Sequence, residues 1–290
     1  MDSLNIIELN DFISTDFFDN ICNGGSDMIT DKQKSQFEVF GFLIVKQLFS
    51  PEEVEIITTE FESVMLEDRN GLPYDGKSRQ TTENWFRRRE PVHFLETDER
   101  IHGPIKRLLG DGYTYRASDG NLYIGNTGWH PDMGWDPSIP EGMKDPQFLS
   151  GDRANNHYHP SIKVAFYLDS VTEHTGSLRV IPGSHKNPYH DQLWSLHLDV
   201  PVNASALDDL PPRLLKMWEQ STGSKEGGEQ FLSDPDENHF GLSPNQIPSY
   251  SIQSEPGDAV FFSHQLWHAS FGGKVGRRMF TLNFAAKKID

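Results

Sequence analysis

The segment EPGDAVFFSHQLWHASFGGKVGRRMFTLNF, residues 255–284, decides the predicted fold. It opens with a Pro-Gly turn and the short apolar strand 259–262, and a Gly-Gly turn later leads into a second strand of alternating character at 277–284. We therefore expect a hairpin that carries His268 on one arm and Arg278 on the other. Such short strands and turns are typical of a mainly β domain.

The tripeptide His130-Pro131-Asp132 is a candidate metal-binding sequence. Residues 121–126 look like a strand, and the Gly and Pro residues that follow indicate an irregular strand end. Side chains two residues apart in an extended segment share a face, so His130 and Asp132 can contact one ion. A lone His-x-Asp is also common in exposed turns. With His268 as third ligand, the set matches the two-histidine, one-carboxylate arrangement of non-haem Fe(II) sites.

Arg278 gives the predicted hairpin a second function. A planar guanidinium matches a carboxylate through two parallel hydrogen bonds. If His268 on one arm holds a metal, Arg278 on the other arm could bind the far carboxylate of a dicarboxylate attached to that metal.

The chain resembles the phytanoyl-CoA dioxygenase-like family of Fe(II)/2-oxoglutarate-dependent oxygenases. Residues 37–45 and 48–54 look like the opening helix, strand and second helix of that family, whereas 162–169 and 175–185 look like the central strand pair of its double-stranded β-helix, or jelly roll. The resemblance implies that core, with flanking N-terminal helices. It also implies binding of Fe(II) by the catalytic residues His130, Asp132 and His268.

The same resemblance assigns the binding of the C5 carboxylate of the co-substrate 2-oxoglutarate to Arg278 and Ser270. The spacing from His268 to Arg278 is one residue shorter than is usual for the family, so Arg277 stays a second candidate. Related halogenases carry a small residue in place of the metal-binding carboxylate. The presence of Asp132 therefore favours oxygenation over halogenation.

Two basic features are candidates for binding the primary substrate. The run Arg87-Arg88-Arg89 could orient an anionic molecule, although charged runs are usually solvated surface that pairs with nearby carboxylates. Lys163 interrupts an apolar strand and shares a face with Ala165 and Tyr167, so it is expected to point into the barrel. A buried lysine needs a partner, which predicts a carboxylate ligand or an acidic neighbour.

Other histidines give weaker signals. The pair His157 and His159 lacks a second ligand set at suitable spacing, which favours a structural or substrate-lining position over a metal site. On a helix, His264 and His268 would resemble a metal-binding pair, but the surrounding pattern predicts strand and turn instead.

The order of segments along the chain predicts one catalytic domain at 31–290, preceded by an irregular arm at 1–30. Helices are expected at 31–40, at 51 to about 66 and at 99–109, from their capping residues and glycine stops. The stretch from about 190 to 250 is rich in Asp, Pro, Ser and Gly, which predicts an insertion or lid.

Composition excludes several other classes of protein. The formal charge of −17 makes nucleic acid an unsuitable partner, and no run of apolar residues is long enough to cross a membrane. A single cysteine cannot form an internal disulfide, and the first residues lack the pattern of a signal peptide. A cytoplasmic location is the simplest expectation, and the oligomeric state stays open.

Taken together, the residues and the resemblance imply an oxygenase that uses O2 and 2-oxoglutarate to remove hydrogen from an unactivated C–H bond of a small, carboxylate-bearing metabolite, natural-product or amino-acid-derived. Hydroxylation, desaturation or cyclisation would follow, with succinate and CO2 as co-products. The alternatives are a phytanoyl-type acyl-CoA hydroxylase, a cupin-like metal enzyme without redox chemistry, and an inactive binding module.

Overall fold

The computed structural model describes residues 29–132, 151–152, 157–158, 160–186, 188–193, 196, 240–242 and 244–287. Most of the predicted arm at 1–30 and most of the predicted insertion at 190–250 lie outside these residues. Those two predictions, and the domain bounds that depend on them, stay predictions.

The three predicted helices are present as α2 (Asp31–Phe40), α3 (Pro51–Asp68) and α4 (Glu99–Leu109). Capping fixes the start of the first two. Thr30 and Ser50 each accept a hydrogen bond from the backbone N–H three residues later, and the side chains of Gln33 and Glu53 return the interaction. The first helix ends at Gly41, whose φ of 84° is a left-handed conformation that glycine adopts readily. No described helix is both long enough and apolar enough to cross a bilayer.

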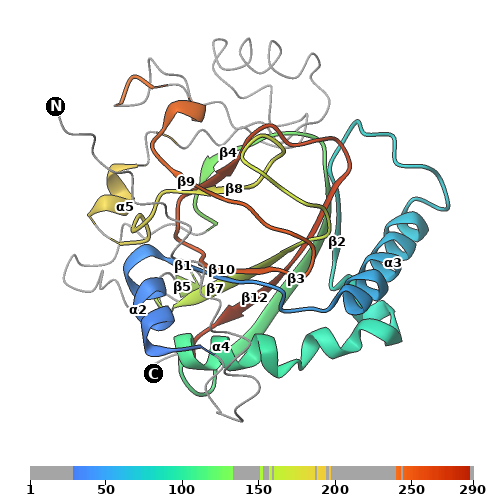
Figure 1. Ribbon diagram of the computed structural model, residues 1–290, viewed down its shortest axis with the longest axis horizontal. Coiled ribbons are helices and arrows are strands. Elements are labelled where there is room, and N and C mark those ends of the chain that lie inside the picture. The colour runs from blue at the N-terminus through green and yellow to red at the C-terminus, as the bar shows by residue number, and fades with distance from the viewer. Residues whose placement is uncertain are drawn as a thin grey trace.

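Two antiparallel sheets form the core of the molecule. The large sheet has the order β1-β10-β7-β12-β3-β2 and contains β1 (Phe42–Val45), β2 (Gln80–Glu83), β3 (Thr114–Tyr123), β7 (Ser161–Tyr167), β10 (Ala259–Ser263) and β12 (Arg277–Ala285). The small sheet has the order β4-β11-β8-β9 and contains β4 (Thr127–His130), β8 (Leu178–Val180), β9 (Tyr250–Ile252) and β11 (His268–Ser270). In Figure 1 the small sheet lies above the large sheet, and the helices surround the large sheet, with α2 at the lower left, α4 below and α3 at the right.

The described chain also contains several short elements. They are the two-stranded sheet of β5 (Gly151–Asp152) and β6 (His157–Tyr158), the short helix α5 (Tyr189–Gln192), and the 3-10 helices at Trp85–Arg88, Glu90–Glu96 and Pro244–Gln246.

From β3 onward, most steps along the chain cross between the two sheets, which confirms the predicted double-stranded β-helix. The chain passes from β3 to β4, from β7 to β8, and from β10 through β11 to β12, and each step changes sheet. The predicted hairpin of His268 and Arg278 is therefore wrong. Strand β11 pairs with β4 and β8, whereas β12 pairs with β3 and β7. Likewise, 162–169 and 175–185 contribute β7 and β8 to opposite sheets and do not pair directly.

Strand β12 separates the helix-side core from the interior of the barrel. Its even-numbered residues Phe280, Leu282 and Phe284 are fully buried in the cluster that also contains the apolar residues of α3 and α4. The ring of Phe280 stacks on Phe166 with centroids 4.7 Å apart. Because neighbouring side chains of a strand point to opposite faces, the odd-numbered residues of β12 face the space between the two sheets.

Candidate metal centre

Three predicted metal ligands come together between the sheets. His130 and His268 are cross-strand partners on β4 and β11, and their ring centroids are 4.3 Å apart. Asp132 follows β4 by two residues, and its Oδ2 is 3.8 Å from Nε2 of His268. One ligand atom from each residue lies within 4.8 Å of the others. This separation allows all three to contact one ion.

Backbone carbonyls fix the orientation of both imidazoles. Nδ1 of His130 donates to the carbonyl of Gly128, and Nδ1 of His268 donates to that of Leu266, each at 2.8 Å. A carbonyl oxygen can only accept, so the proton of the neutral ring is on Nδ1 and the lone pair is on Nε2. Metal-binding histidines commonly use this arrangement.

The electrostatics leave the three side chains in the protonation states that a divalent metal needs. Burial, together with the neighbouring His268, lowers the pKa of His130 to about 3. Burial also lowers the pKa of His268. For Asp132, burial alone would raise the pKa, but Lys163 and then the nearby histidines outweigh it and hold that pKa well below its usual value. At neutral pH the donors are two neutral imidazoles and a carboxylate, a set that fits Fe(II).

Lys163 points into the barrel, as predicted from the alternation of β7. Its Nζ lies 2.6 Å from Oδ1 of Asp132, so the acidic neighbour that the sequence required is a candidate metal ligand. The ammonium group is thus engaged within the protein.

These side chains line a cavity of about 130 Å³ between the sheets. Its polar wall contains the three candidate ligands together with Lys163, Thr127, Ser270 and Arg277, and its apolar wall includes Ala165, Leu178, Phe262 and Met279. A cavity with apolar walls and a few convergent polar groups is the usual form of a small-molecule site.

The structure corrects the choice between the two arginines of β12. Arg277 lines the cavity and is only 5% exposed, whereas Arg278 lies on the opposite face of the strand. The Arg278 guanidinium pairs with Asp169 at 2.6 Å and also with Glu62 of α3. The prediction that Arg278 faces the metal ligands is therefore wrong, because the even-numbered positions of β12 face the helices.

Ser270 stands beside Arg277, as expected of a partner in carboxylate binding. Nη1 of Arg277 donates to Oγ of Ser270 at 2.6 Å and also to the backbone carbonyl of Gly176. The guanidinium carbon lies 4.8 Å from the ring centroid of Tyr123, its cross-strand neighbour on β3.

Gly176 is a residue that the sequence analysis did not single out. Its φ of +91° is unfavourable for other residues, and a Cβ at this position would collide with the Arg277 guanidinium. The signal was the Thr175-Gly176-Ser177 turn between two apolar strands, but nothing in the sequence showed that an arginine a hundred residues later would lie against it.

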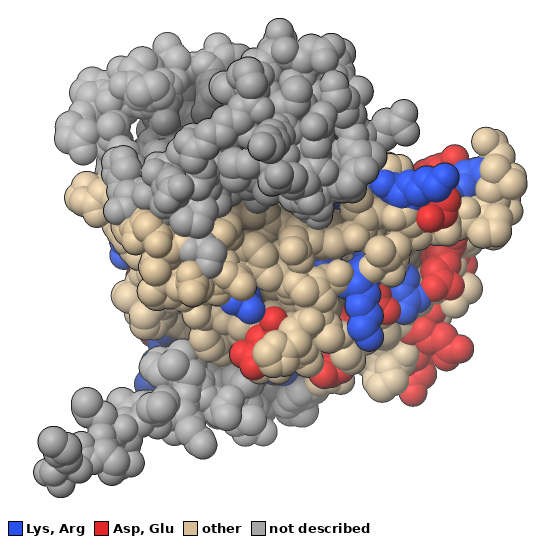
Figure 2. Space-filling model, turned by 90° about the horizontal axis from the view of Figure 1, so that it is seen from above, with Lys and Arg blue, Asp and Glu red and all other residues tan. Residues whose placement is uncertain are grey.

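The basic run at 87–89 does not reach the cavity. Arg87 pairs with Glu96, Arg88 pairs with Asp68, and Arg89 pairs with Glu67 of α3. On the face that Figure 2 shows, basic and acidic side chains likewise lie next to one another. The prediction that this run binds the substrate is corrected: it is surface charge that adjacent carboxylates balance.

The remaining histidines do not extend the metal site. His264 lies in a turn, as predicted, and its Nε2 is 3.0 Å from Oδ1 of Asn283. Only the backbone of His157 is described, and His159 lies outside the described residues, so the prediction for that pair stays a prediction.

Comparison with known proteins finds a curated relative and solved structures of similar fold. The curated relative, an ectoine dioxygenase of Nocardia farcinica, is 29% identical over 170 residues, 54% of this chain. The match spans about half (52%) of that protein's length.

Two of the similar solved structures contain a bound metal. HygX from Streptomyces hygroscopicus, with nickel and 2-oxoglutarate bound, is 18% identical with a TM-score of 0.54 and coverage of 89% of this chain and 88% of that one. EctD from S. alaskensis, with bound Fe, is 18% identical with a TM-score of 0.53 and coverage of 91% and 78%. At such identities these likenesses show the fold.

The family is shown by a separate match. The model of the phytanoyl-CoA dioxygenase (PhyH) family matches residues 37–279, well over half of the chain. The chain belongs to the phytanoyl-CoA dioxygenase family of Fe(II)/2-oxoglutarate-dependent dioxygenases, as its sequence motifs predicted.

Proposed function

We propose that this protein is an Fe(II)- and 2-oxoglutarate-dependent oxygenase that acts on a C–H bond of a small molecule. One observation carries the proposal: the cavity holds two neutral imidazoles and a carboxylate able to bind one metal, and a buried arginine beside them. The 2-oxoglutarate in HygX and the iron in EctD, proteins of the same fold, support this choice of co-substrate and metal.

In the proposed site, His130, Asp132 and His268 hold Fe(II). Arg277 and Ser270 bind the C5 carboxylate of 2-oxoglutarate, Arg277 taking the role that the sequence gave to Arg278. Iron with 2-oxoglutarate and O2 supplies an oxidant for unactivated C–H bonds, and the protein supplies binding and orientation. The apolar wall formed by Phe262 and Met279 would keep water away from the reacting atoms.

The substrate part of the proposal is less specific than the sequence analysis suggested. Both features that favoured a carboxylate on the substrate are used elsewhere, because Lys163 contacts Asp132 and the run at 87–89 pairs with surface carboxylates. We therefore retain a small-molecule substrate without specifying its charge.

The test is succinate formation by the purified protein supplied with Fe(II), 2-oxoglutarate and O2. Fractions of a small-metabolite extract should stimulate it, and His268→Ala should lose the stimulated rate. If no extract or added metabolite raises succinate above the background of His268→Ala, the oxygenase proposal fails. A metal-dependent change in a metabolite without consumption of 2-oxoglutarate would instead favour a cupin-like enzyme.

A further inference from the structure

We propose that Lys163 is a positioning residue for the metal centre, which holds one oxygen of Asp132 and leaves the other oxygen for the metal. This inference rests on the proposed function, because it assumes that Asp132 binds the metal.

The two carboxylate oxygens of Asp132 have different neighbours. Oδ1 is 2.6 Å from Nζ of Lys163, whereas Oδ2 is 3.8 Å from Nε2 of His268. Nε2 carries the lone pair of His268 and is therefore its metal-binding atom. Oδ2, the Asp132 oxygen near Nε2, is then the oxygen that would bind the same metal. The ammonium group occupies the opposite side of the same carboxylate.

The fold fixes Lys163 in this position. On β7, Ile162, Val164 and Phe166 are buried in the helix-side core, so alternation directs Lys163 into the barrel. The strand is held on both sides, since Lys163 pairs with Phe262 of β10 and with Asn283 of β12. Asp132 lies just after β4 of the small sheet. The contact of Lys163 with Asp132 therefore links the large sheet to the end of β4. Among the described residues, Asp132 is the carboxylate within ion-pair distance of this ammonium.

This contact has a consequence for the metal's open positions. A free carboxylate can bind a metal through both oxygens, which uses one more coordination position. A two-histidine, one-carboxylate site needs three open positions, two for a 2-oxo acid and one for O2. For Oδ1 to reach the metal, the carboxylate would have to give up its charge-assisted hydrogen bond to Lys163. Lys163 thus keeps Asp132 bound through a single oxygen and preserves the third open position.

The experiment is a titration of the protein with Co(II), without co-substrate, read as a dissociation constant and as the visible Co(II) spectrum. Lys163→Met removes the charge and the donor but keeps an unbranched side chain. It should weaken Co(II) binding about tenfold to a hundredfold, the usual effect of losing a hydrogen-bond partner of a metal ligand. The Co(II) spectrum should also change, because the carboxylate is no longer held. Lys163→Arg, which keeps a charged donor, should restore much of the affinity.

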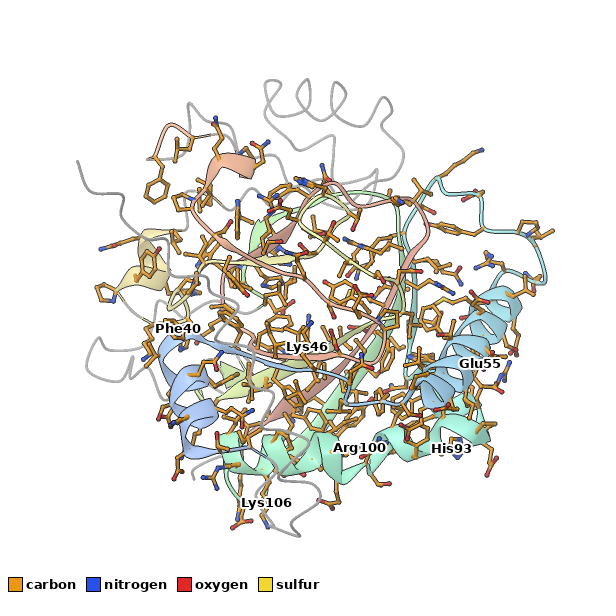
Figure 3. The ribbon with its side chains drawn as sticks, in the orientation of Figure 1. Phe40, Lys46, Glu55, His93, Arg100 and Lys106 are labelled. Atoms are coloured by element: carbon orange, nitrogen blue, oxygen red, sulfur yellow. The ribbon has the colours of Figure 1, made fainter. Side chains whose placement is uncertain are left out.

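The chain offers a matched control in Lys46, which follows β1 and is labelled in Figure 3. It pairs with the buried Asp258 at 2.7 Å, and neither residue lines the cavity. Lys46→Met therefore removes a similar ion pair without touching the proposed site, and it should leave the Co(II) affinity and spectrum unchanged. If Lys163→Met does not fold, Lys163→Leu, which also removes the charge and the donor, is measured in the same way.

The inference is overturned if a folded Lys163→Met or Lys163→Leu protein binds Co(II) with wild-type affinity and spectrum. It is also overturned if either binds Co(II) more tightly, since the ammonium would then merely repel the metal. If the proposed metal site itself is wrong, the result is different from these outcomes. The wild-type protein would then not bind Co(II), or His268→Ala would bind it equally well.

Discussion

Arg277 and Arg278 are adjacent in the sequence, yet they lie in opposite electrostatic environments. Arg278 on the helix side of β12 contacts two carboxylates, those of Asp169 and Glu62. Arg277 on the barrel side is buried, and among the described residues its hydrogen-bond acceptors are a carbonyl and a hydroxyl. A buried cation without a carboxylate partner is costly, which indicates a site for an anionic ligand. The presence or absence of a carboxylate partner therefore distinguishes an arginine with a structural role from one that is available to bind a ligand.

The run at 87–89 extends this comparison. Each of its arginines has a carboxylate partner on or near α3, so the charge of the run is already balanced. Lys163 is an intermediate case, because it lines the cavity but its partner is a candidate metal ligand. Of these cations, Arg277 alone faces the cavity without a carboxylate partner among the described residues.

The largest effect is expected from the metal ligands. His130→Ala or His268→Ala should abolish Fe(II) binding, because a three-ligand site has no spare donor. The fold should persist, since both side chains face the cavity and contribute little to the helix-side core. Metal analysis of the protein reconstituted without oxygen measures Fe(II) binding, and circular dichroism checks that the fold persists. Stoichiometric iron in either variant would contradict the assignment.

The next effect concerns the two faces of β12. Phe280→Ala should lower the free energy of unfolding by about 3–5 kcal/mol, because it leaves a cavity between Trp85 and Phe166 in the helix-side core. Urea unfolding measures this loss. The barrel-side neighbour Thr281, changed to Val, should cost much less. Equal losses would show that the assignment of even-numbered residues to the core is incorrect.

Arg277→Leu should weaken 2-oxoglutarate binding to the metal-loaded protein by about 1.5–3 kcal/mol, the usual loss for a charged hydrogen bond. Arg278→Leu should leave that affinity unchanged and cause only a small loss of stability, since its ion pairs are partly exposed. Calorimetric titration of 2-oxoglutarate into the Ni(II)-loaded proteins compares them. A reversal of the two results would mean that the register of β12 is shifted by one residue.

The smallest effect is expected at the surface. Arg88→Gln should leave the KM for 2-oxoglutarate and the rate of succinate formation within about twofold of wild type, as is usual for surface substitutions away from special sites. Steady-state assays of 2-oxoglutarate turnover measure both values. A marked rise in KM would return the basic run to the list of binding residues.

The sequence predicted the fold class and the metal ligands because both depend on local patterns. The capped helices, the short apolar strands and the His-x-Asp motif can each be read within a few residues. The distant His268 was found through the family resemblance and through the strand that precedes it.

The errors came from relations between segments. A Gly-Gly turn between two strands indicates a hairpin, but here β11 and β12 lie in opposite sheets, so counting residues across that turn could not decide whether Arg277 or Arg278 faces the metal. The acidic partners of Arg87, Arg88 and Arg89 also lie on other elements. The contact of Arg277 with Gly176 joins residues a hundred positions apart, and no local pattern indicates it.

The central claim is that the cavity binds a 2-oxo acid to iron. Its most direct test is optical titration of the wild-type protein without oxygen, first with Fe(II) and then with 2-oxoglutarate, using His268→Ala as control. Chelation of iron by the 2-oxo acid should produce a visible charge-transfer band in the wild-type protein and none in the variant. Glutarate, which has both carboxylates but no keto group, should give no band. If 2-oxoglutarate gives no band, or gives the same band in His268→Ala, the account is contradicted.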